Sequence, residues 1–166
     1  VAIALSYSYY ERTTGFVRDY AYIRRINFGL GAECSYSGKF IEQPSCMTSP
    51  FPRVAVWGDS FAMHLVPGLL TSSFGGALVQ MTQSSCAPVL NLAIVKPEGS
   101  ENNAAAAASC IGFNRSVYEY LTAKESIEYV IMSSPLDYMF DTRGVYLSGD
   151  DTVDVNDRLL LESFSA

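Results

Sequence analysis

A serine that directly follows a short apolar run is the residue best placed to do chemistry in this sequence. Residues 54–57 (VAVW) are apolar and largely β-branched, as expected of a strand covered on both faces, and Gly58 permits a tight turn after them. From Phe61 onward, apolar residues recur at helical spacing, so Ser60 stands where unpaired backbone N–H groups converge. A serine hydroxyl there could attack an ester, and the resulting oxyanion would be stabilised by those N–H groups.

A purely structural interpretation of the same residues stays open. Gly-Asp-Ser is a common loop tripeptide, and both Asp59 and Ser60 are residue types that cap helices. The strand before the turn and the helix after it favour the catalytic interpretation, because α/β hydrolases present their nucleophile at such a turn. We expect Asp59 to cap the helix and support the turn.

The single histidine, His64, is a poor candidate for the base that would activate Ser60. It lies four residues further along the same predicted helix, where the two side chains run roughly parallel. A catalytic base must approach the serine hydroxyl and be oriented by a carboxylate. We therefore expect a packing or capping role for His64, and we expect the later aspartates to be solvated charges: Asp137, Asp141, Asp150, Asp151 and Asp154.

Composition restricts the possible functions. The chain has 166 residues, 49% of them hydrophobic, which is enough for one α/β domain with its own core. Its net charge is −6 and its 11 Lys and Arg residues are scattered, which argues against a nucleic-acid surface. No C-x-x-C spacing occurs, and with one histidine we expect no metal and no cofactor.

The four cysteines favour disulfides and an oxidising compartment, because their number is even and they lie in loop-like segments. Local pairing of Cys34 with Cys46 and of Cys86 with Cys110 would close two modest loops. Three pairings are possible, and four separate buried thiols remain an alternative.

Strand and helix patterns alternate along the chain. The predicted elements are a strand at 54–57, a helix at about 61–71, a strand at 77–82, a helix at 113–121 that the alanine run 104–108 could begin earlier, a strand at 128–134 and the start of a helix at 155–164. Residues 91–109 are otherwise weakly patterned, and residues 149–151 read as an acidic turn. The alternation predicts a parallel sheet with right-handed crossovers. The polar turn 83–88 would lie at the carboxyl edge, where such sheets bind ligands.

The beginning of the chain has a different character. Residues 1–10 are apolar and aromatic and run into Glu11 and Arg12, as in the last turns of a membrane span, although neither a full span nor a secretory signal is present. We therefore expect residues 1–30 to be the end of a transmembrane helix with a linker, and residues 31–166 to form a partial domain.

Several motifs at these positions resemble the SGNH (GDSL-like) hydrolase superfamily, and more closely the SGNH domain fused C-terminal to acyltransferase-3 type membrane O-acyltransferases. Residues 56–67 (VWGDSFAMHLVP) resemble its WGDSHA block, and residues 80–88 (QMTQSSCAP) resemble its Q-x-(S/T)-x-x-x-C-x-P turn. Cys110, Phe113 and Asn114 at a helix entry, with the strand 130–134 behind them, form a third match. Residues 5–12 resemble the close of the last acyltransferase span.

This resemblance implies a three-layer α/β/α, flavodoxin-like sandwich with a parallel sheet. It makes Ser60 the nucleophile that forms an acyl-enzyme, with its own N–H as one oxyanion donor. Superfamily members use a glycine and an asparagine as further donors. Asn114 is the nearest candidate for the asparagine, although the usual Gly-x-Asn-Asp block is absent, and the N–H of Ser84 or Ser85 could replace the glycine.

The implied function is O-acyl transfer, usually of acetyl, to a cell-surface glycan such as lipopolysaccharide O-antigen or peptidoglycan. An upstream membrane acyltransferase domain would deliver the acyl donor, and the protein would reside in the inner membrane with this domain on the periplasmic or extracytoplasmic side. Two alternatives remain: a secreted esterase or lipase of the same superfamily, and a noncatalytic glycan-binding module with a degenerate triad.

The chain departs from the family pattern in three places. Phe61 replaces the histidine that usually follows the serine, and Pro135-Leu136 stands where an Arg-Trp pair often follows the third strand. The late D-x-x-H motif that supplies the catalytic Asp and His does not occur before Ala166. We therefore expect a C-terminally truncated domain that is inactive by itself.

Overall fold

The computed structural model describes residues 25–95, 103–136, 145–148 and 151–154. Its principal sheet has three parallel strands in the order β2-β1-β4, as the alternation of patterns predicts. These strands are β1 (Val54–Gly58), β2 (Leu78–Thr82) and β4 (Tyr129–Ser133), and the helices between them are α3 (Ser60–Leu70) and α4 (Ala104–Ala123). In register, Gly58 lies opposite Thr82 and Ser133, so the three strands end at one common edge.

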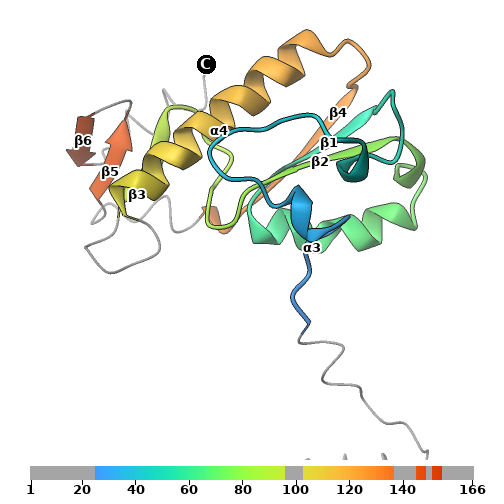
Figure 1. Cartoon of the computed structure of the whole chain (residues 1–166), viewed down its shortest axis with the longest axis horizontal. Coiled ribbons are helices and arrows are strands. Elements are labelled where there is room, and N and C mark those ends of the chain that lie inside the picture. The colour runs from blue at the N-terminus through green and yellow to red at the C-terminus, as the bar shows by residue number, and fades with distance from the viewer. Residues whose placement is uncertain (1–24, 96–102, 137–144, 149–150, 155–166) are drawn as a thin grey trace, which may run out of the picture.

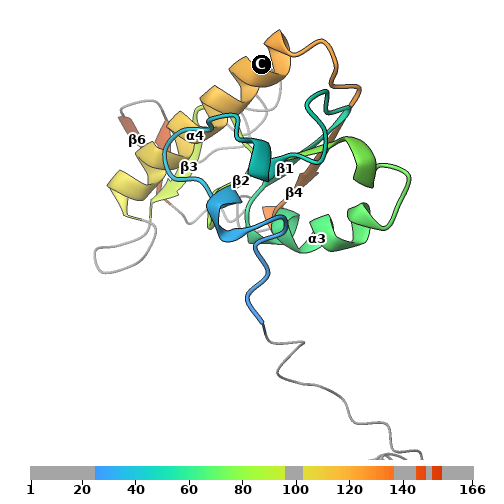
Figure 2. The same ribbon diagram turned by 45° about the vertical axis from the view of Figure 1, so that its right-hand side comes forward.

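The two helices cover opposite faces of this sheet. Residues of β1 are buried on both faces. Val56 packs with Val66 of α3 in one core cluster, whereas Trp57 belongs with Phe113 of α4 to another. Alternate strand residues point to opposite faces, so β1 lies between the helices. Figures 1 and 2 show α4 on one side of the sheet and α3 on the other. The expected three-layer α/β/α arrangement is confirmed for the described residues.

Both helices begin at a side-chain cap. The Phe61 N–H donates to Asp59 at the start of α3, and the Ala106 N–H donates to the side chain of Asn103 at the start of α4. The alanine run therefore does open α4 early, and the predicted helix 113–121 is only its second half. Alanine has the highest helix propensity, which accounts for this extension.

A second, antiparallel sheet was not predicted. Its strands are β3 (Leu92–Val95), β5 (Val145–Ser148) and β6 (Asp151–Asp154), in the order β3-β5-β6. The weakly patterned region 91–109 thus begins with a strand, and Asp151 belongs to β6 and not to a turn. These strands have four residues each, and so short a run does not establish a period.

The segment before β1 lies along the principal sheet. The side chain of Gln80, buried in β2, accepts a hydrogen bond from the Leu30 N–H and donates one to the Phe28 carbonyl, each at 2.8 Å. Two short 3₁₀ helices, η1 (Ala32–Cys34) and η2 (Pro44–Cys46), follow this anchor. These two hydrogen bonds of Gln80 hold residues 28–30 against β2.

Both disulfides follow the local pairing. Cys34 bonds to Cys46 and Cys86 bonds to Cys110, so all four cysteines of the chain are paired. Within the described ranges, none of the helices combines the length and the apolar character that crossing a membrane requires. The predicted span end at 1–10 and the predicted helix at 155–164 lie outside the described residues.

Candidate active site

The turn from β1 into α3 places Ser60 at the common edge of the parallel strands. Gly58 has φ of +150°, a conformation that side-chain-bearing residues rarely adopt, and a Cβ atom there would collide with the Ser133 carbonyl of β4. The glycine therefore allows β1 and β4 to end close together. Ser60 follows as the first residue of α3, and it is exposed.

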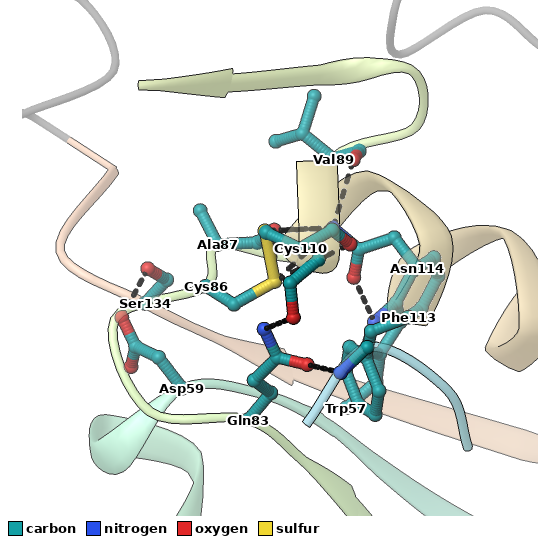
Figure 3. The surroundings of a disulfide bond; sticks show 12 residues. Trp57, Asp59, Gln83, Cys86, Ala87, Val89, Cys110, Phe113, Asn114 and Ser134 are labelled. Carbon is teal, nitrogen blue, oxygen red and sulfur yellow. Dashed lines mark hydrogen bonds between the residues drawn. A yellow bond between two sulfur atoms is a disulfide. The ribbon is translucent and has the colours of Figure 1, made fainter. Parts of the chain in front are cut away.

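Asp59 holds this turn in place. It is 5% exposed. Its Oδ1 accepts a hydrogen bond from the Phe61 N–H at 2.8 Å, and its Oδ2 accepts one from the Ser134 hydroxyl at 2.7 Å. Figure 3 shows the pairing with Ser134, which comes from the end of β4. Asp59 thus caps α3 as predicted and also ties the nucleophile turn to the neighbouring strand.

The polar turn after β2 forms the second part of the site. The Gln83 N–H donates to the Gly58 carbonyl at 3.0 Å, which brings this turn beside Ser60. The Gln83 side chain accepts from the Gly38 N–H at 2.9 Å and donates to the Ser109 hydroxyl of α4 at 3.3 Å. Ser85 has φ of +56°, a left-handed conformation that is uncommon for serine and that proteins concentrate at functional sites.

A cavity of about 660 Å³ opens between these segments. Six serines line it: Ser37, Ser60, Ser84, Ser85, Ser109 and Ser134. Small and apolar residues of β3 and of the first turns of α4 also line it, among them Leu92, Ala93 and Ala106. The structure therefore brings Ser60 and Ser85 to one cavity. No described residue accepts a hydrogen bond from the N–H of either serine.

Asn114 does not reach this cavity, which corrects the oxyanion role predicted for it. It is fully buried on α4. Its carboxamide oxygen accepts from the Trp57 indole N–H at 2.8 Å, and its amide nitrogen donates to the carbonyls of Ala87 and Val89 at 2.8 and 2.9 Å. Figure 3 shows these partners around the Cys86–Cys110 disulfide. Because its carboxamide makes all of these hydrogen bonds, Asn114 holds Ala87 and Val89 against α4 and does not contact a ligand.

Comparison with known families agrees with this geometry. The family model described as "SGNH domain (fused to AT3 domains)" matches residues 33–164. The chain belongs to this SGNH family. Searches among curated proteins and among solved structures return no match. The matched range includes the Ser60 turn, the turn after β2 and both disulfides of the SGNH domain, and members of such hydrolase-like families are generally enzymes.

The SGNH domain's histidine does not take part in the described cavity. His64 is exposed on α3 and is not among the lining residues. A search of the described residues finds no cluster of His, Cys, Asp and Glu that could hold a metal ion. Of the two residues that replace the family's Arg-Trp pair, Pro135 lines the cavity. Leu136 packs against Val89 and Leu92.

Gln83 belongs to the polar turn 83–88, which the sequence placed at the ligand-binding edge, whereas Ser109 and Ser134 were not singled out. A signal existed for Ser134, because it directly follows a parallel strand and parallel strands end at the same edge. Ser109 carries no comparable signal, since it lies inside a helix and its contact with Gln83 depends on the packing of α4.

Proposed function

We propose that Ser60 of this SGNH domain accepts an acyl group, which we expect to be acetyl, and transfers it to a hydroxyl of a cell-surface glycan. The observation that carries the proposal is the exposed Ser60 side chain, which stands at the start of α3 and lines a serine-rich cavity. The association of the family with AT3 domains supports acyl transfer over simple hydrolysis.

The reaction has two balanced steps. In the first, the Ser60 hydroxyl oxygen attacks the acyl carbonyl carbon of a donor ester, a base takes the hydroxyl proton, and the donor alcohol leaves with a proton. In the second, a sugar hydroxyl attacks the acyl-serine ester, gives up its proton to the same base, and Ser60 leaves as the free hydroxyl. Each step passes through a tetrahedral oxyanion.

The backbone N–H groups of Ser60 and Ser85 are the proposed donors to that oxyanion. Both residues line the cavity, and neither N–H is engaged by another described residue. Unengaged donors that are fixed in advance lower the barrier because they need no reorganisation when charge develops. His64 does not line the cavity, so the proposal does not assign the role of base to it.

The acyl donor is delivered by a membrane acyltransferase domain, and the acceptor is a glycan such as O-antigen or peptidoglycan. The two disulfides support an oxidising location, so we place the domain on the extracytoplasmic side of the inner membrane.

To test this, the Ser60 substitution is introduced into the natural gene in cells that make the glycan. The glycan is then purified, and its ester-linked acyl groups are measured by NMR. We expect Ser60→Ala to abolish acylation. The control is Ser73→Ala, because Ser73 is exposed near the end of α3 and does not line the cavity. Unchanged acylation in Ser60→Ala would favour a noncatalytic glycan-binding module, and release of the acyl group only to water would favour an esterase.

A further inference from the structure

We propose that the cavity beside Ser60 binds an uncharged pyranose ring, stacked on Phe61, and that acidic sugars are excluded. The inference rests on the proposed function, because it specifies the acceptor of the same site. It depends on three features: an exposed aromatic residue at the cavity, the charge of the lining, and the small side chains within the lining.

Phe61 is an aromatic side chain held at the cavity next to the nucleophile. It is 54% exposed and lines the cavity. Its backbone N–H donates a hydrogen bond to Asp59, which fixes the position of its backbone at the start of α3. One face of a pyranose ring presents C–H groups, and such a face packs on an aromatic ring and removes apolar surface from water. Stacking there would place the sugar hydroxyls near Ser60.

The lining matches an uncharged ligand that is rich in hydroxyl groups. Among the described lining residues, Asp59 is the only acidic or basic side chain of the Asp, Glu, Lys, Arg and His types, and both of its carboxyl oxygens already accept hydrogen bonds. The serines and Gln83 can both donate and accept hydrogen bonds, as sugar hydroxyls do. No Lys or Arg is among these lining residues to compensate a carboxylate that loses its water. The net charge of −6 adds a general repulsion of anions.

Small side chains in the lining leave room for a ring. Ala93 of β3 and Ala105 and Ala106 of α4 line the cavity with single methyl groups. Larger side chains at these positions would reduce the volume of the cavity. The alanines therefore leave space for a ring, while the serines and Gln83 supply its hydrogen bonds.

The experiment measures binding of two ligands that differ only at C6, methyl β-D-glucopyranoside and methyl β-D-glucuronide, by saturation-transfer NMR titration. The glucoside should bind, and the glucuronide should bind at least about tenfold more weakly, since its carboxylate finds no cation in the lining. Repeating the titration at high salt separates the effect of the lining from the general repulsion, which salt screens.

Matched variants locate the binding. Phe61→Ala should weaken glucoside binding several-fold, whereas Leu65→Ala should leave it unchanged, because Leu65 is also exposed on α3 but does not line the cavity. Ser84→Lys should recover glucuronide binding, because Ser84 is exposed and lines the cavity. The same change at Ser73, outside the cavity, should not.

Three results would overturn the proposal: equal or tighter binding of the glucuronide at high salt, no detectable binding of the glucoside, or an unchanged affinity in Phe61→Ala. The titration needs no acyl transfer, so Ser60→Ala should retain glucoside binding. If acylation in cells depends on Ser60 but the two ligands bind equally, the proposed sugar preference is wrong and the proposed acyl transfer stands. If acylation does not depend on Ser60 but the glucoside binds more tightly, the acyl transfer is wrong and the sugar preference stands.

Discussion

Asp59 is the residue through which the fold positions Ser60. Its two carboxylate oxygens connect the first turn of α3 to the end of β4, through the Phe61 N–H and the Ser134 hydroxyl. A hydrogen bond to a charged group contributes roughly 1.5–3 kcal/mol. The Ser134 hydroxyl is therefore expected to matter for activity although it does not react.

Ser134→Ala tests this positioning role. Loss of the hydroxyl should lower the rate of acyl transfer about tenfold and the free energy of unfolding by about 1–2 kcal/mol. Ser134→Thr keeps the hydroxyl and should recover most of the rate. Kinetics of glycan acylation and urea unfolding give the two measurements. Equal activity in all three proteins would show that Asp59 holds the turn without Ser134.

The positions of Ser60 and Asp59 at the turn could be predicted from the sequence, because a buried strand and an apolar-patterned helix flank them directly. The oxyanion role that the resemblance implied for Asn114 does not fit its buried position, and the sequence could not show this because its partners Trp57, Ala87 and Val89 come from distant segments. A polar residue in a helix pattern does not reveal whether its amide faces a cavity or a set of buried backbone carbonyls.

At the scale of elements, the Cys86–Cys110 disulfide fastens the turn after β2 to α4. Cys86 follows Ser85 directly, and Cys110 lines the cavity next to Ser109. The Cys34–Cys46 disulfide lies elsewhere, and neither of its cysteines lines the cavity. The chain therefore contains two disulfides of which only one borders the site.

Removing each disulfide in turn distinguishes an effect on stability from an effect on the geometry of the site. The double variant Cys86→Ala/Cys110→Ala should lower the free energy of unfolding by about 3 kcal/mol and also weaken glucoside binding. The variant Cys34→Ala/Cys46→Ala should be destabilised comparably but should keep its sugar affinity. Urea unfolding and the NMR titration measure the two effects. An intact affinity in the first variant would mean that the turn keeps its position without the disulfide.

Elements differed in how far the sequence predicted them. The three parallel strands and their helices could be predicted because each has a continuous apolar pattern and lies in the expected order. The antiparallel sheet could not, because β3 pairs with β5 far away in the chain and neither strand is long enough to show a period. That sheet matters for the site, since β3 lines the cavity.

At the scale of the whole molecule, an aromatic cluster connects the loop before β1 to the core beneath the cavity. The Tyr36 ring contacts the rings of Phe40 and Phe113, at centroid distances of 5.1 and 6.1 Å. Burial raises the pKa of Tyr36 to about 12. Folding therefore favours the neutral phenol.

This pKa shift predicts how stability depends on alkaline pH. Below about pH 10, the ordinary pKa, the phenol is neutral in both the folded and the unfolded chain, and its contribution is intact. As the pH rises from about 10 to about 12, the unfolded chain ionises first and stability falls. Tyr36→Phe should shift the pH midpoint of alkaline unfolding upward. Tyr118→Phe should not, because Tyr118 is exposed. Circular dichroism across a pH titration measures the midpoint, and coincident curves would contradict the assignment.

The central claim, that Ser60 carries the acyl group, is tested most directly by peptide mass spectrometry. The protein is isolated from cells that make its acyl donor, digested, and the peptide containing Ser60 is examined for an added acyl group that hydroxylamine removes. We predict the acyl group on Ser60 in the wild-type and Ser73→Ala proteins and its absence in Ser60→Ala, together with loss of glycan acylation. Full glycan acylation in Ser60→Ala, with no acyl group on this peptide in the wild type, would contradict the account.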